Sequence, residues 1–255
     1  MPAYYAHYRF GKQVLAAMPS QQRQCVQRFR RMYDMGLNGP DIFFYFNPFW
    51  NTAIGDLGHT FHRQSGQEFF GNACTAATTE AAQAYLYGLL AHYCLDTACH
   101  PYIQQLVDIG EAKHVPLESE FERYLLLRDK EPSPQSYDMS KRWHLTRGEC
   151  ITAAGLYPGT SGADISRCVK FMSFSVKFLQ SPNRASREKL LQMLKPSLCE
   201  YMIPAEENKE TALYVQGLKT RYDRARKQYP LLLEQLTVSL QTGRALGSDF
   251  TPNFG

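Results

Sequence analysis

The chain has 255 residues, of which 44% are hydrophobic and 20% are charged, so it can bury a sizeable core and is not dominated by disorder. Its 28 lysines and arginines exceed its 24 aspartates and glutamates by four, an excess too small to indicate nucleic acid binding by charge alone. No run of about 18 apolar residues is present, and the N-terminal segment lacks the basic start, apolar run and cleavage site of a signal peptide. We therefore expect a cytoplasmic protein.

Apolar residues recur along the chain with helical spacing, and Gly, Pro, Ser and Asn separate the apolar runs, which predicts an all-α fold, a multi-helix bundle. The expected helices cover residues 10–18, 20–36 with Ser20 as N-cap, 51–64, 66–77, 79–108, 116–129, 164–180, 185–195, 207–227 and 230–242. Residues 129–163 are the least periodic part of the chain and are rich in Pro and Gly, so we expect a long loop there.

These helices are expected to form a single domain over residues 1–255. A metal-binding core of about residues 1–130 is expected first, for reasons given below, and a C-terminal helical half of about residues 160–255 then completes the bundle. The closing segment, residues 249–255, is expected to lie back over the core.

The histidines are clustered: five of the seven lie between residues 59 and 114, at His59, His62, His92, His100 and His114. On the helix predicted for 79–108, His92, Asp96 and His100 follow one another at intervals of four residues. At 3.6 residues per turn, this spacing places the three side chains within roughly 80° of one another on one helix face. His114 and Glu118 repeat the interval on a second helix. Nitrogen and oxygen donors at this spacing are typical of a zinc site.

Taken singly, each of these histidines is better explained as a core or capping residue, and each acid as a solvated one. Five histidines together favour metal binding instead. Apolar residues surround the stripe at 92, 96 and 100, so Asp96 is expected in a largely buried helix. An isolated charge there costs several kcal/mol or more unless it is paired or bound to a metal.

The seven cysteines are odd in number and are scattered without a Cys-x-x-Cys pair, in a chain without an export signal. We therefore expect free thiols. Cys94 and Cys99 lie inside the histidine-rich segment, so a zinc-binding role for either one is an alternative. Buried cysteine more often behaves as a small hydrophobic side chain.

Six short motifs follow one another in a fixed order. They are Ala-His-Tyr-Arg-Phe-Gly with His7, Gly-Pro-Asp-Ile-Phe-Phe-Tyr with Asp41, Leu-Gly-His-Thr-Phe-His with His59 and His62, Ala-His-Tyr-Cys-Leu-Asp with His92 and Asp96, His-Pro with His100, and His-Val-Pro-Leu-Glu with His114 and Glu118. In order and spacing this set resembles the bacterial zinc-dependent phospholipase C family, an all-α fold related to fungal single-strand nucleases. The resemblance covers approximately residues 1–130.

The resemblance implies two to three zinc ions in one cleft. The first ion is implied to bind Asp41, His62, His92 and Asp96. Asp96 is implied to bridge to a second ion that also takes His7, and the remaining ion is implied to bind His100, His114 and Glu118. Spacing alone leaves the choice between His59 and His62 open, and the family pattern favours His62 with His59 as its neighbour. In secreted members a processed N-terminus completes one of the three sites; no processing signal is present here, so occupancy of that site stays open.

Clustered divalent ions stabilise the negative charge that develops when a phosphodiester is cleaved, and they lower the pKa of bound water toward neutrality. Asp41 is then the candidate catalytic residue, which orients or deprotonates that water as well as binding metal. On local sequence alone, Asp41 after Gly39 and Pro40 is better explained as a turn or N-cap residue. Its place in the series of motifs is what favours the catalytic role.

Two further features have a structural explanation and a functional alternative. Aromatic residues are dense beside the predicted ligands, at Tyr4, Tyr5, Tyr8, Phe43, Phe44, Tyr45, Phe46, Phe49 and Trp50. A helical core explains most of them, and an apolar mouth for acyl chains, a base or a quaternary ammonium is the alternative. The basic stretch from Lys219 to Lys227 is usually a solvated helix face; attraction to anionic lipid or nucleic acid is the alternative.

The prediction is therefore a zinc-dependent phosphoric diester hydrolase of phospholipase C type. Its expected substrate is a small phosphodiester or a phospholipid, with which a peripheral membrane contact is compatible. A metal-dependent nuclease or nucleotide phosphoesterase is the second hypothesis, with nucleic acid the less favoured substrate. The third is a non-catalytic helical protein with a closed structural zinc site, and the number of candidate ligands argues against it.

Overall fold

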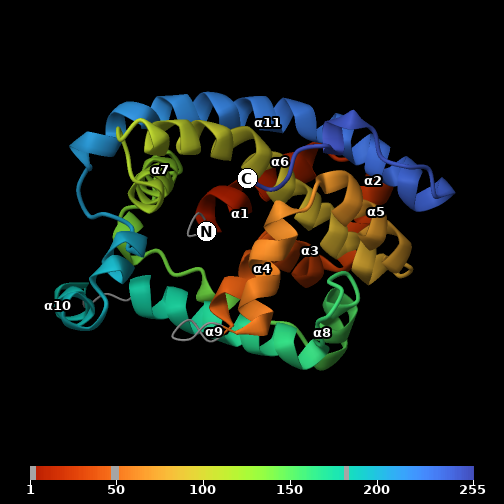
Figure 1. The fold of residues 1–255 in the computed structure, drawn as a ribbon, viewed down its shortest axis with the longest axis horizontal. Helices are drawn as coiled ribbons and strands as arrows, with labels where there is room; N and C mark the ends of the chain where they lie inside the picture. Colours follow the sequence, from red (N-terminus) through yellow and green to blue (C-terminus); the bar gives the residue numbers. More distant parts are fainter. Residues whose placement is uncertain (1–3, 47–51, 181–183) are drawn as a thin grey trace.

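The structure is a computed structural model that describes residues 4–46, 52–180 and 184–255. In these residues the chain forms α-helices and short 3-10 helices, without a strand (Figure 1). The first half contains α1 (Tyr4–Ala17), α2 (Ser20–Arg28), α3 (Arg30–Gly36), η1 (Gly39–Tyr45), α4 (Ala53–Arg63), α5 (Gly66–Ala76), α6 (Glu80–Asp108) and α7 (His114–Arg128). The second half contains η2 (Pro134–Ser136), η3 (Ser140–Arg142), α8 (Arg147–Ala154), α9 (Gly162–Gln180), α10 (Arg184–Leu194), η4 (Pro196–Tyr201), α11 (Lys209–Thr242) and η5 (Ser248–Phe250). The predicted all-α fold is confirmed.

Helix α6 is the central element of the fold. Its 29 residues begin after Thr79, whose hydroxyl accepts a hydrogen bond from the Ala82 N–H, and most of them are buried. It packs against α1, α2, α3, α5, α7, α8, α11 and η1. A helix covered on so many sides is apolar around most of its circumference, which is why its sequence has no sharp polar face.

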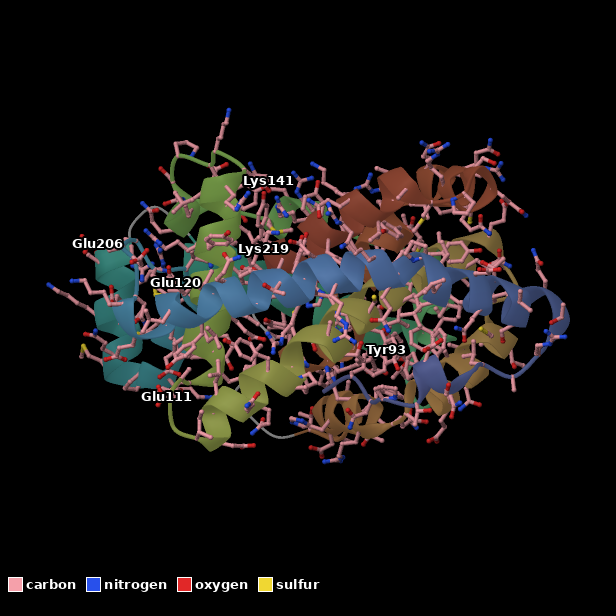
Figure 2. All side chains as sticks on the ribbon, turned by 90° about the horizontal axis from the view of Figure 1, so that it is seen from above. Tyr93, Glu111, Glu120, Lys141, Glu206 and Lys219 are labelled. Atoms are coloured by element: carbon pink, nitrogen blue, oxygen red, sulfur yellow. The ribbon has the colours of Figure 1, made fainter. Side chains whose placement is uncertain are left out.

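Helix α11 covers one side of α6 along much of the molecule, as Figure 2 shows from above. It begins after Asn208, whose side chain caps Glu210 N, and the main-chain N–H of Asn208 donates to Glu120 of α7 (3.1 Å). It ends at Gly243, which adopts a left-handed conformation (φ +68°) suited to glycine. The prediction of two helices, 207–227 and 230–242, was wrong because Pro230 lies inside one continuous helix.

Three other expectations about helices need correction. Helix α1 begins at Tyr4 rather than at residue 10. The helix predicted for 20–36 breaks at Phe29, where the backbone leaves helical geometry (φ −116°, ψ 46°), and Ser20 follows the N-cap residue Pro19 instead of serving as the cap. Residues 129–163 are not a long loop throughout, because they contain η2, η3 and α8, the last with a capping box between Thr146 and Glu149.

The end of the chain folds back over the core, as expected for residues 249–255. Phe250 and Phe254 are fully buried, and the Phe254 ring packs at 5.1–5.2 Å from the rings of Tyr93 and Phe69. The Pro252 carbonyl accepts hydrogen bonds from the Tyr93 hydroxyl (2.9 Å) and from the main chain of α5 (2.8 Å). In Figure 1 the C-terminus therefore lies near the centre of the molecule, beside α6.

Helices α3 and α6 touch through their backbones. A Cβ atom on Gly36 would lie 2.1 Å from the Tyr85 carbonyl oxygen, and one on Gly88 would lie 2.2 Å from the Tyr33 carbonyl oxygen. Only glycine fits at both positions, because the clashing atoms belong to backbone that cannot move independently. This close approach fixes the loop after α3, which carries the first part of the site described below.

We therefore expect Gly36→Ala to lower the free energy of unfolding by about 1–3 kcal/mol or more, because the extra methyl group forces two helices apart. The measurement is urea unfolding followed by circular dichroism, with chelator present. Gly71→Ala in α5 is the matched control, since a Cβ there meets nothing within 4 Å. This substitution is expected to raise the free energy of unfolding by about 0.5–1 kcal/mol, because alanine favours the helix more than glycine does. Equal unfolding midpoints for the two variants would contradict the close-contact explanation.

Candidate metal centre

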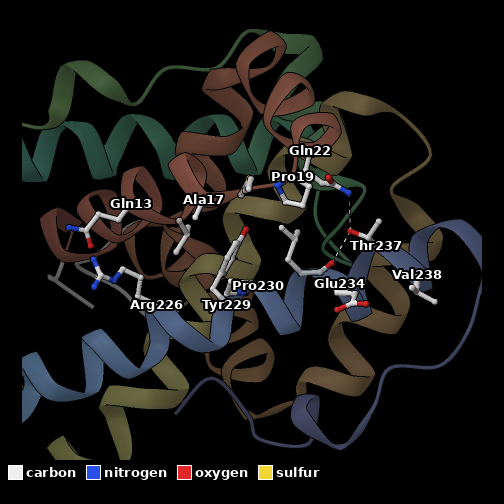
Figure 3. Close-up of a pocket in the computed structure, with 13 residues that line it drawn as sticks. Gln13, Ala17, Pro19, Gln22, Arg226, Tyr229, Pro230, Glu234, Thr237 and Val238 are labelled. Atoms are coloured by element: carbon white, nitrogen blue, oxygen red, sulfur yellow. Dashed lines mark hydrogen bonds between the residues drawn. The ribbon is translucent and has the colours of Figure 1, made fainter.

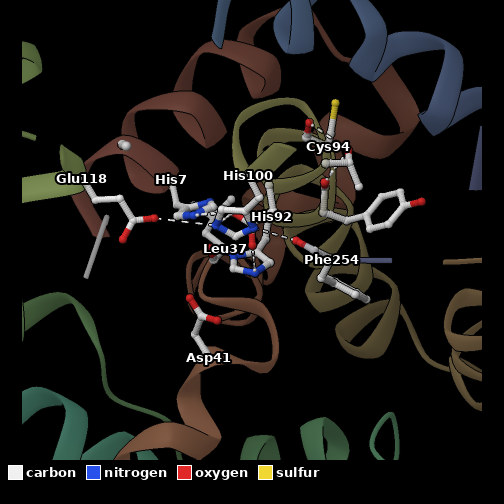
Figure 4. A network of polar contacts seen from close by, with 12 residues as sticks. His7, Leu37, Asp41, His92, Cys94, His100, Glu118 and Phe254 are labelled. Atoms are coloured by element: carbon white, nitrogen blue, oxygen red, sulfur yellow. Dashed lines mark hydrogen bonds and ion pairs between the residues drawn. The ribbon is translucent and has the colours of Figure 1, made fainter. Parts of the chain in front are cut away.

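Five separate segments bring all eight predicted ligand residues to one place. They come from the first turn of α1, from η1, from the last turn of α4, from the middle of α6 and from the start of α7, and they are His7, Asp41, His62, His92, Asp96, His100, His114 and Glu118. Seven of the eight are buried, and only His114 is half-buried. Figure 4 shows five of them pointing toward one another from four of these segments.

The Gly-Pro-Asp motif has a geometric reason. Gly39 adopts a left-handed backbone (φ +52°), and a Cβ on it would lie 2.2 Å from the His92 ring. Pro40 then occupies the first turn of η1, where its missing N–H costs nothing. Asp41 follows with its side chain buried and directed at His62. Gly39 is thus required by its close contact with α6, Pro40 suits the start of η1, and Asp41 pairs with His62 of α4.

The donor atoms form three groups, in each of which they lie within 4.8 Å of one another. The first group is Asp41, His62 and His92, with His62 Nε2 2.8 Å from Asp41 Oδ1. The second is His7, His92 and Asp96, with the two Nε2 atoms 3.2 and 3.0 Å from the carboxylate of Asp96.

The third group is His100, His114 and Glu118, with the two Nε2 atoms 3.6 and 3.1 Å from Glu118 Oε1. His100 Nε2 is also 3.8 Å from Asp96. His92 is shared by two groups, and Asp96 lies beside residues of all three. The arrangement is one continuous centre with Asp96 in its middle.

Main-chain carbonyls orient three of the imidazoles from behind. The Nδ1 atoms of His62, His92 and His100 lie 2.7, 3.2 and 2.8 Å from the carbonyl oxygens of Gly58, Leu37 and Phe254, respectively. A carbonyl oxygen can only accept, so each Nδ1 carries the proton and each Nε2 is left to face the carboxylates. Outer hydrogen bonds of this type fix the ring orientation of metal-binding histidines.

The buried charges change the pKa values of the carboxyl groups. Burial raises the pKa of Asp96, but His100, His92 and His7 outweigh this effect and hold it well below its usual value. Burial raises the pKa of Glu118 too, but His100 and His114 outweigh it. The pKa of Asp41 also lies below normal despite its burial, with His62 and His92 among the groups that lower it. All three carboxyl groups are therefore ionised at neutral pH.

Two of the histidines, His92 and His100, respond in the opposite direction, with raised pKa values. Burial lowers the pKa of His100, but Asp96, Glu118 and the Phe254 carbonyl outweigh it and raise the pKa to about 9. His92 is raised for similar reasons, by Asp96 and Asp41. At His7, burial and the nearby His92 dominate, so its pKa is lowered.

The donor set fits divalent metal ions. Nε2 of His92 and of His100, with one oxygen each of Asp96 and Glu118, are buried and make no hydrogen bond of good geometry among the described residues. Buried polar atoms without such partners are rare in folded proteins and point to an unseen ligand. A cavity of about 20 Å³, lined in part by His7, Asp96, His100 and Glu118, has room for a particle the size of a water molecule or an ion.

Other residues considered as ligands lie elsewhere. His59 is exposed on α4 and contacts the Phe44 ring (4.8 Å), whereas His62 is buried beside Asp41. Cys94 donates to the Ala225 carbonyl (3.3 Å) and belongs to none of the three groups; nor does Cys99. Burial raises the pKa of both thiols, which keeps them protonated and unsuited to bind metal.

Aromatic side chains line one side of the centre. Tyr4 lies 5.0 Å from Trp143 and 6.1 Å from Tyr45, ring to ring, and Phe44 lies 5.1 Å from His62. Tyr45 is only partly buried and its pKa is raised, chiefly by burial and also by Tyr201 and by the charges of Glu122 and Glu118. Phe49 and Trp50, also considered for an apolar mouth, lie outside the described residues.

Two parts of the centre were not predicted from the sequence. Glu122 lies one turn after Glu118 on α7, and its Oε1 accepts hydrogen bonds from the main-chain N–H groups of Tyr5 and Ala6 (2.5 and 3.0 Å). It thereby caps α1 next to His7, and the four-residue interval from Glu118 could have revealed it. The Phe254 carbonyl is the second part, and no side chain signals it.

The fold and site define an all-α protein with a buried, multi-histidine centre of the kind that holds divalent metal ions. A family model described as zinc dependent phospholipase C matches residues 6–156, more than half of the chain. The chain belongs to this family of hydrolases, as its motifs predicted. No curated protein and no solved structure matches the chain. Among the described residues, no helix combines the length and apolar character needed to cross a membrane.

The hydrogen bond from His100 to the tail leads to a prediction. Deleting residues 253–255 removes the Phe254 carbonyl, and we expect zinc affinity at the His100 group to fall roughly 10–100-fold. Competition with a chromogenic chelator measures this affinity, and circular dichroism shows whether the chain is folded. Phe254→Leu is the control, because it keeps the carbonyl and an apolar side chain in the buried position of the ring. Unchanged zinc affinity in a folded deletion variant would contradict the role of the tail.

The raised pKa of His100 leads to a second prediction. At pH 7.5 the metal-free protein holds a proton on His100, and zinc must displace it to bind Nε2. We therefore expect at least one proton to be released per chain on zinc binding, and fewer above pH 9. Calorimetry in two buffers of different ionisation enthalpy counts these protons. Release that is absent at pH 7.5, or that does not fall above pH 9, would contradict the assignment.

The same shift predicts how stability depends on pH without metal. A histidine whose pKa rises from its usual 6.5 to about 9 on folding stabilises the protein fully below pH 6.5. That contribution is lost as the pH rises through 9. Thermal unfolding of the chelator-treated protein between pH 6 and 10 is therefore expected to show falling stability, with His100→Asn as the control that removes this part of the slope.

Proposed function

We propose that this protein is a zinc-dependent phosphoric diester hydrolase of phospholipase C type. The observation that carries the proposal is the convergence of eight nitrogen and oxygen donors into three adjoining groups, two of which share His92, with Asp96 within 3.8 Å of a histidine of the third. A single structural zinc site needs four protein ligands and leaves no position for water or substrate. Eight donors are too many for one such site, which argues against the non-catalytic alternative.

The proposed ligand sets follow the three groups. Asp41, His62, His92 and Asp96 hold one ion, and Asp96 and His7 contribute to a second. His100, His114 and Glu118 hold the remaining ion. Each imidazole offers its Nε2 atom. At His7 this choice of nitrogen is based on the 3.2 Å distance between Nε2 and the Asp96 carboxylate.

When bound, zinc ions stabilise negative charge on a phosphoryl group and make a coordinated water acidic enough to attack at neutral pH. The chain supplies the charge balance around them: three carboxylates carry less charge than two or three divalent ions, so the loaded centre stays positive and attracts an anionic phosphodiester. Half-buried His114 is the most exposed of the eight donors and marks the side nearest to solvent.

Asp41 is the proposed catalytic residue. Its carboxylate is buried, and its pKa lies below its usual value, with His62 and His92 among the groups that lower it, so it remains an ionised acceptor that orients a water molecule. The aromatic wall of Tyr4, Tyr45 and Phe44 excludes bulk water and offers apolar surface for the non-polar part of a substrate. A phospholipid meets both requirements, since it has a phosphodiester next to acyl chains.

The test compares the purified, untagged protein with two variants. We expect two to three zinc ions per wild-type chain by elemental mass spectrometry, and hydrolysis of a chromogenic phosphocholine ester. Asp41→Asn is expected to lower turnover at least about 100-fold, because the amide cannot accept a proton. It is expected to keep most of the metal, because the amide has the same shape as the carboxylate. His92→Ala is expected to lose metal from the two groups it joins.

Each readout can reject a separate part of the proposal. Full turnover by Asp41→Asn would remove Asp41 from the mechanism, and unchanged metal content in His92→Ala would reject the ligand sets. Cleavage of single-stranded DNA, run beside the ester, would favour the nuclease hypothesis if it were the faster reaction. One zinc per chain with neither substrate cleaved would favour the structural-zinc hypothesis.

A further inference from the structure

Helix α9 presents an apolar face to solvent that no other described element covers. Phe174 is 66% exposed and Phe171 is 39% exposed, and half-buried Phe178 stacks on Phe174 with ring centroids 6.3 Å apart. At intervals of three and four residues these rings lie in one row along the helix. Large aromatic side chains in a continuous exposed row are unusual on a monomeric surface and mark an interaction site.

Positive charges flank the row. Lys170 and Lys177 are exposed one position before Phe171 and Phe178, and Arg167 continues the same side of α9 toward its N-terminus. Neither lysine forms an ion pair among the described residues. The acidic residue of this helix, Asp164, lies in the first turn, where it bonds to Ser161. The exposed face therefore combines aromatic rings with positive charges and, among the described residues, has no acidic side chain beside the row.

Helix α9 is linked at both ends to elements of the candidate metal centre. At the N-terminal end of α9, the Arg167 guanidinium is 6.0 Å from the Phe46 ring, directly after η1, which carries Asp41. At the C-terminal end, Leu179 packs with Met202, directly after η4, and η4 is bonded to α7 through Ser119 and the Glu200 carbonyl (2.8 Å). Helix α9 thus spans from the Asp41 side to the Glu118 side, along the lower edge in Figure 1.

The other candidate surfaces lack this combination. On α11, Lys219 pairs with Asp223, and Arg221 lies over the Tyr102 ring at 3.7 Å, so the basic stretch is partly engaged within the protein. A groove of about 660 Å³ between α1, α2 and α11 is bridged by a hydrogen bond from Gln22 to Thr237 (Figure 3). Nothing at that groove identifies an occupant.

We infer that the exposed face of α9 docks on an anionic phospholipid surface. The rings of Phe171 and Phe174 insert among the headgroups, and Lys170 and Lys177 face the lipid phosphates. Aromatic and apolar residues beside lysines are the combination by which surface helices bind at a membrane interface without crossing it. The inference rests on the proposed function, because a membrane held along α9 presents phosphodiesters next to the metal centre.

The test measures binding to vesicles directly. Zinc-loaded protein is sedimented with phosphatidylcholine vesicles, with and without phosphatidylglycerol. We expect binding only where the anionic lipid is present, and a loss of at least about tenfold in affinity for Phe171→Ser/Phe174→Ser and for Lys170→Glu/Lys177→Glu. Added salt should weaken wild-type binding and should have little further effect on the lysine variant.

Leu213→Ser/Leu231→Ser is the matched control. Both leucines are exposed on α11, at 77% and 60%, and lie outside the α9 face. This variant should bind vesicles like the wild type. Equal loss in the control and in the phenylalanine variant, or wild-type binding by both α9 variants, would overturn the inference. Unfolding midpoints confirm that all variants are folded.

A soluble substrate separates this inference from the proposed function. The α9 variants should hydrolyse the chromogenic ester at the wild-type rate, since that substrate needs no membrane. If no variant and no wild-type protein cleaves the ester, but vesicle binding still depends on α9, the proposed reaction fails and the docking surface stands. If the ester is cleaved and vesicles are not bound, the docking surface fails and the proposed reaction stands.

Discussion

The carboxylate of Asp96 lies in the middle of a helix that is buried on nearly all sides, and the surrounding structure is arranged around that charge. Left alone in an apolar interior, an ionised carboxylate is so costly that it would take up a proton or unfold its surroundings. Here the imidazoles of His7, His92 and His100 lie within 3.0–3.8 Å of it. They come from only two helices, so the charge fixes how the start of α1 meets the middle of α6.

The orientation of these imidazoles also depends on backbone groups behind them. The imidazoles of His92 and His100 need acceptors behind them, and the Leu37 and Phe254 carbonyls provide them. The Leu37 carbonyl is in reach because α3 and α6 touch at glycines, and the Phe254 carbonyl because the tail is anchored by buried rings. Gly255 also lies against the His100 ring, where a Cβ would come within 2.2 Å of Nδ1. Contacts between segments that are far apart in the chain thus orient the rings of His92 and His100.

The sequence predicted those parts of the centre that a helix encodes locally. The four-residue intervals of His92, Asp96 and His100 can be recognised in the sequence because each helix turn brings residues at this spacing together. The positions of the helices along most of the chain follow from the same periodicity. The break at Phe29 and the continuity of α11 through Pro230 depend on packing against α6. The helix propensities of neighbouring residues do not predict such packing. The choice between His59 and His62 depended on which face of α4 meets η1, and the backbone acceptors carry no side-chain signal at all.

The apolar core and the donor cluster are built from different residues, and this bears on what a bound metal would do for the fold. Structural zinc sites in small domains supply the energy of folding, and such domains unfold without metal. Here a large apolar core packs around α6 independently of the donors, and ion pairs between histidines and carboxylates hold the donors in place. The raised pKa of His100, about 9, means that zinc would have to displace a proton from this imidazole in order to bind it at neutral pH. Where an apolar core of this size carries the fold, the metal ligands can leave coordination positions open for water and substrate, as a catalytic centre requires.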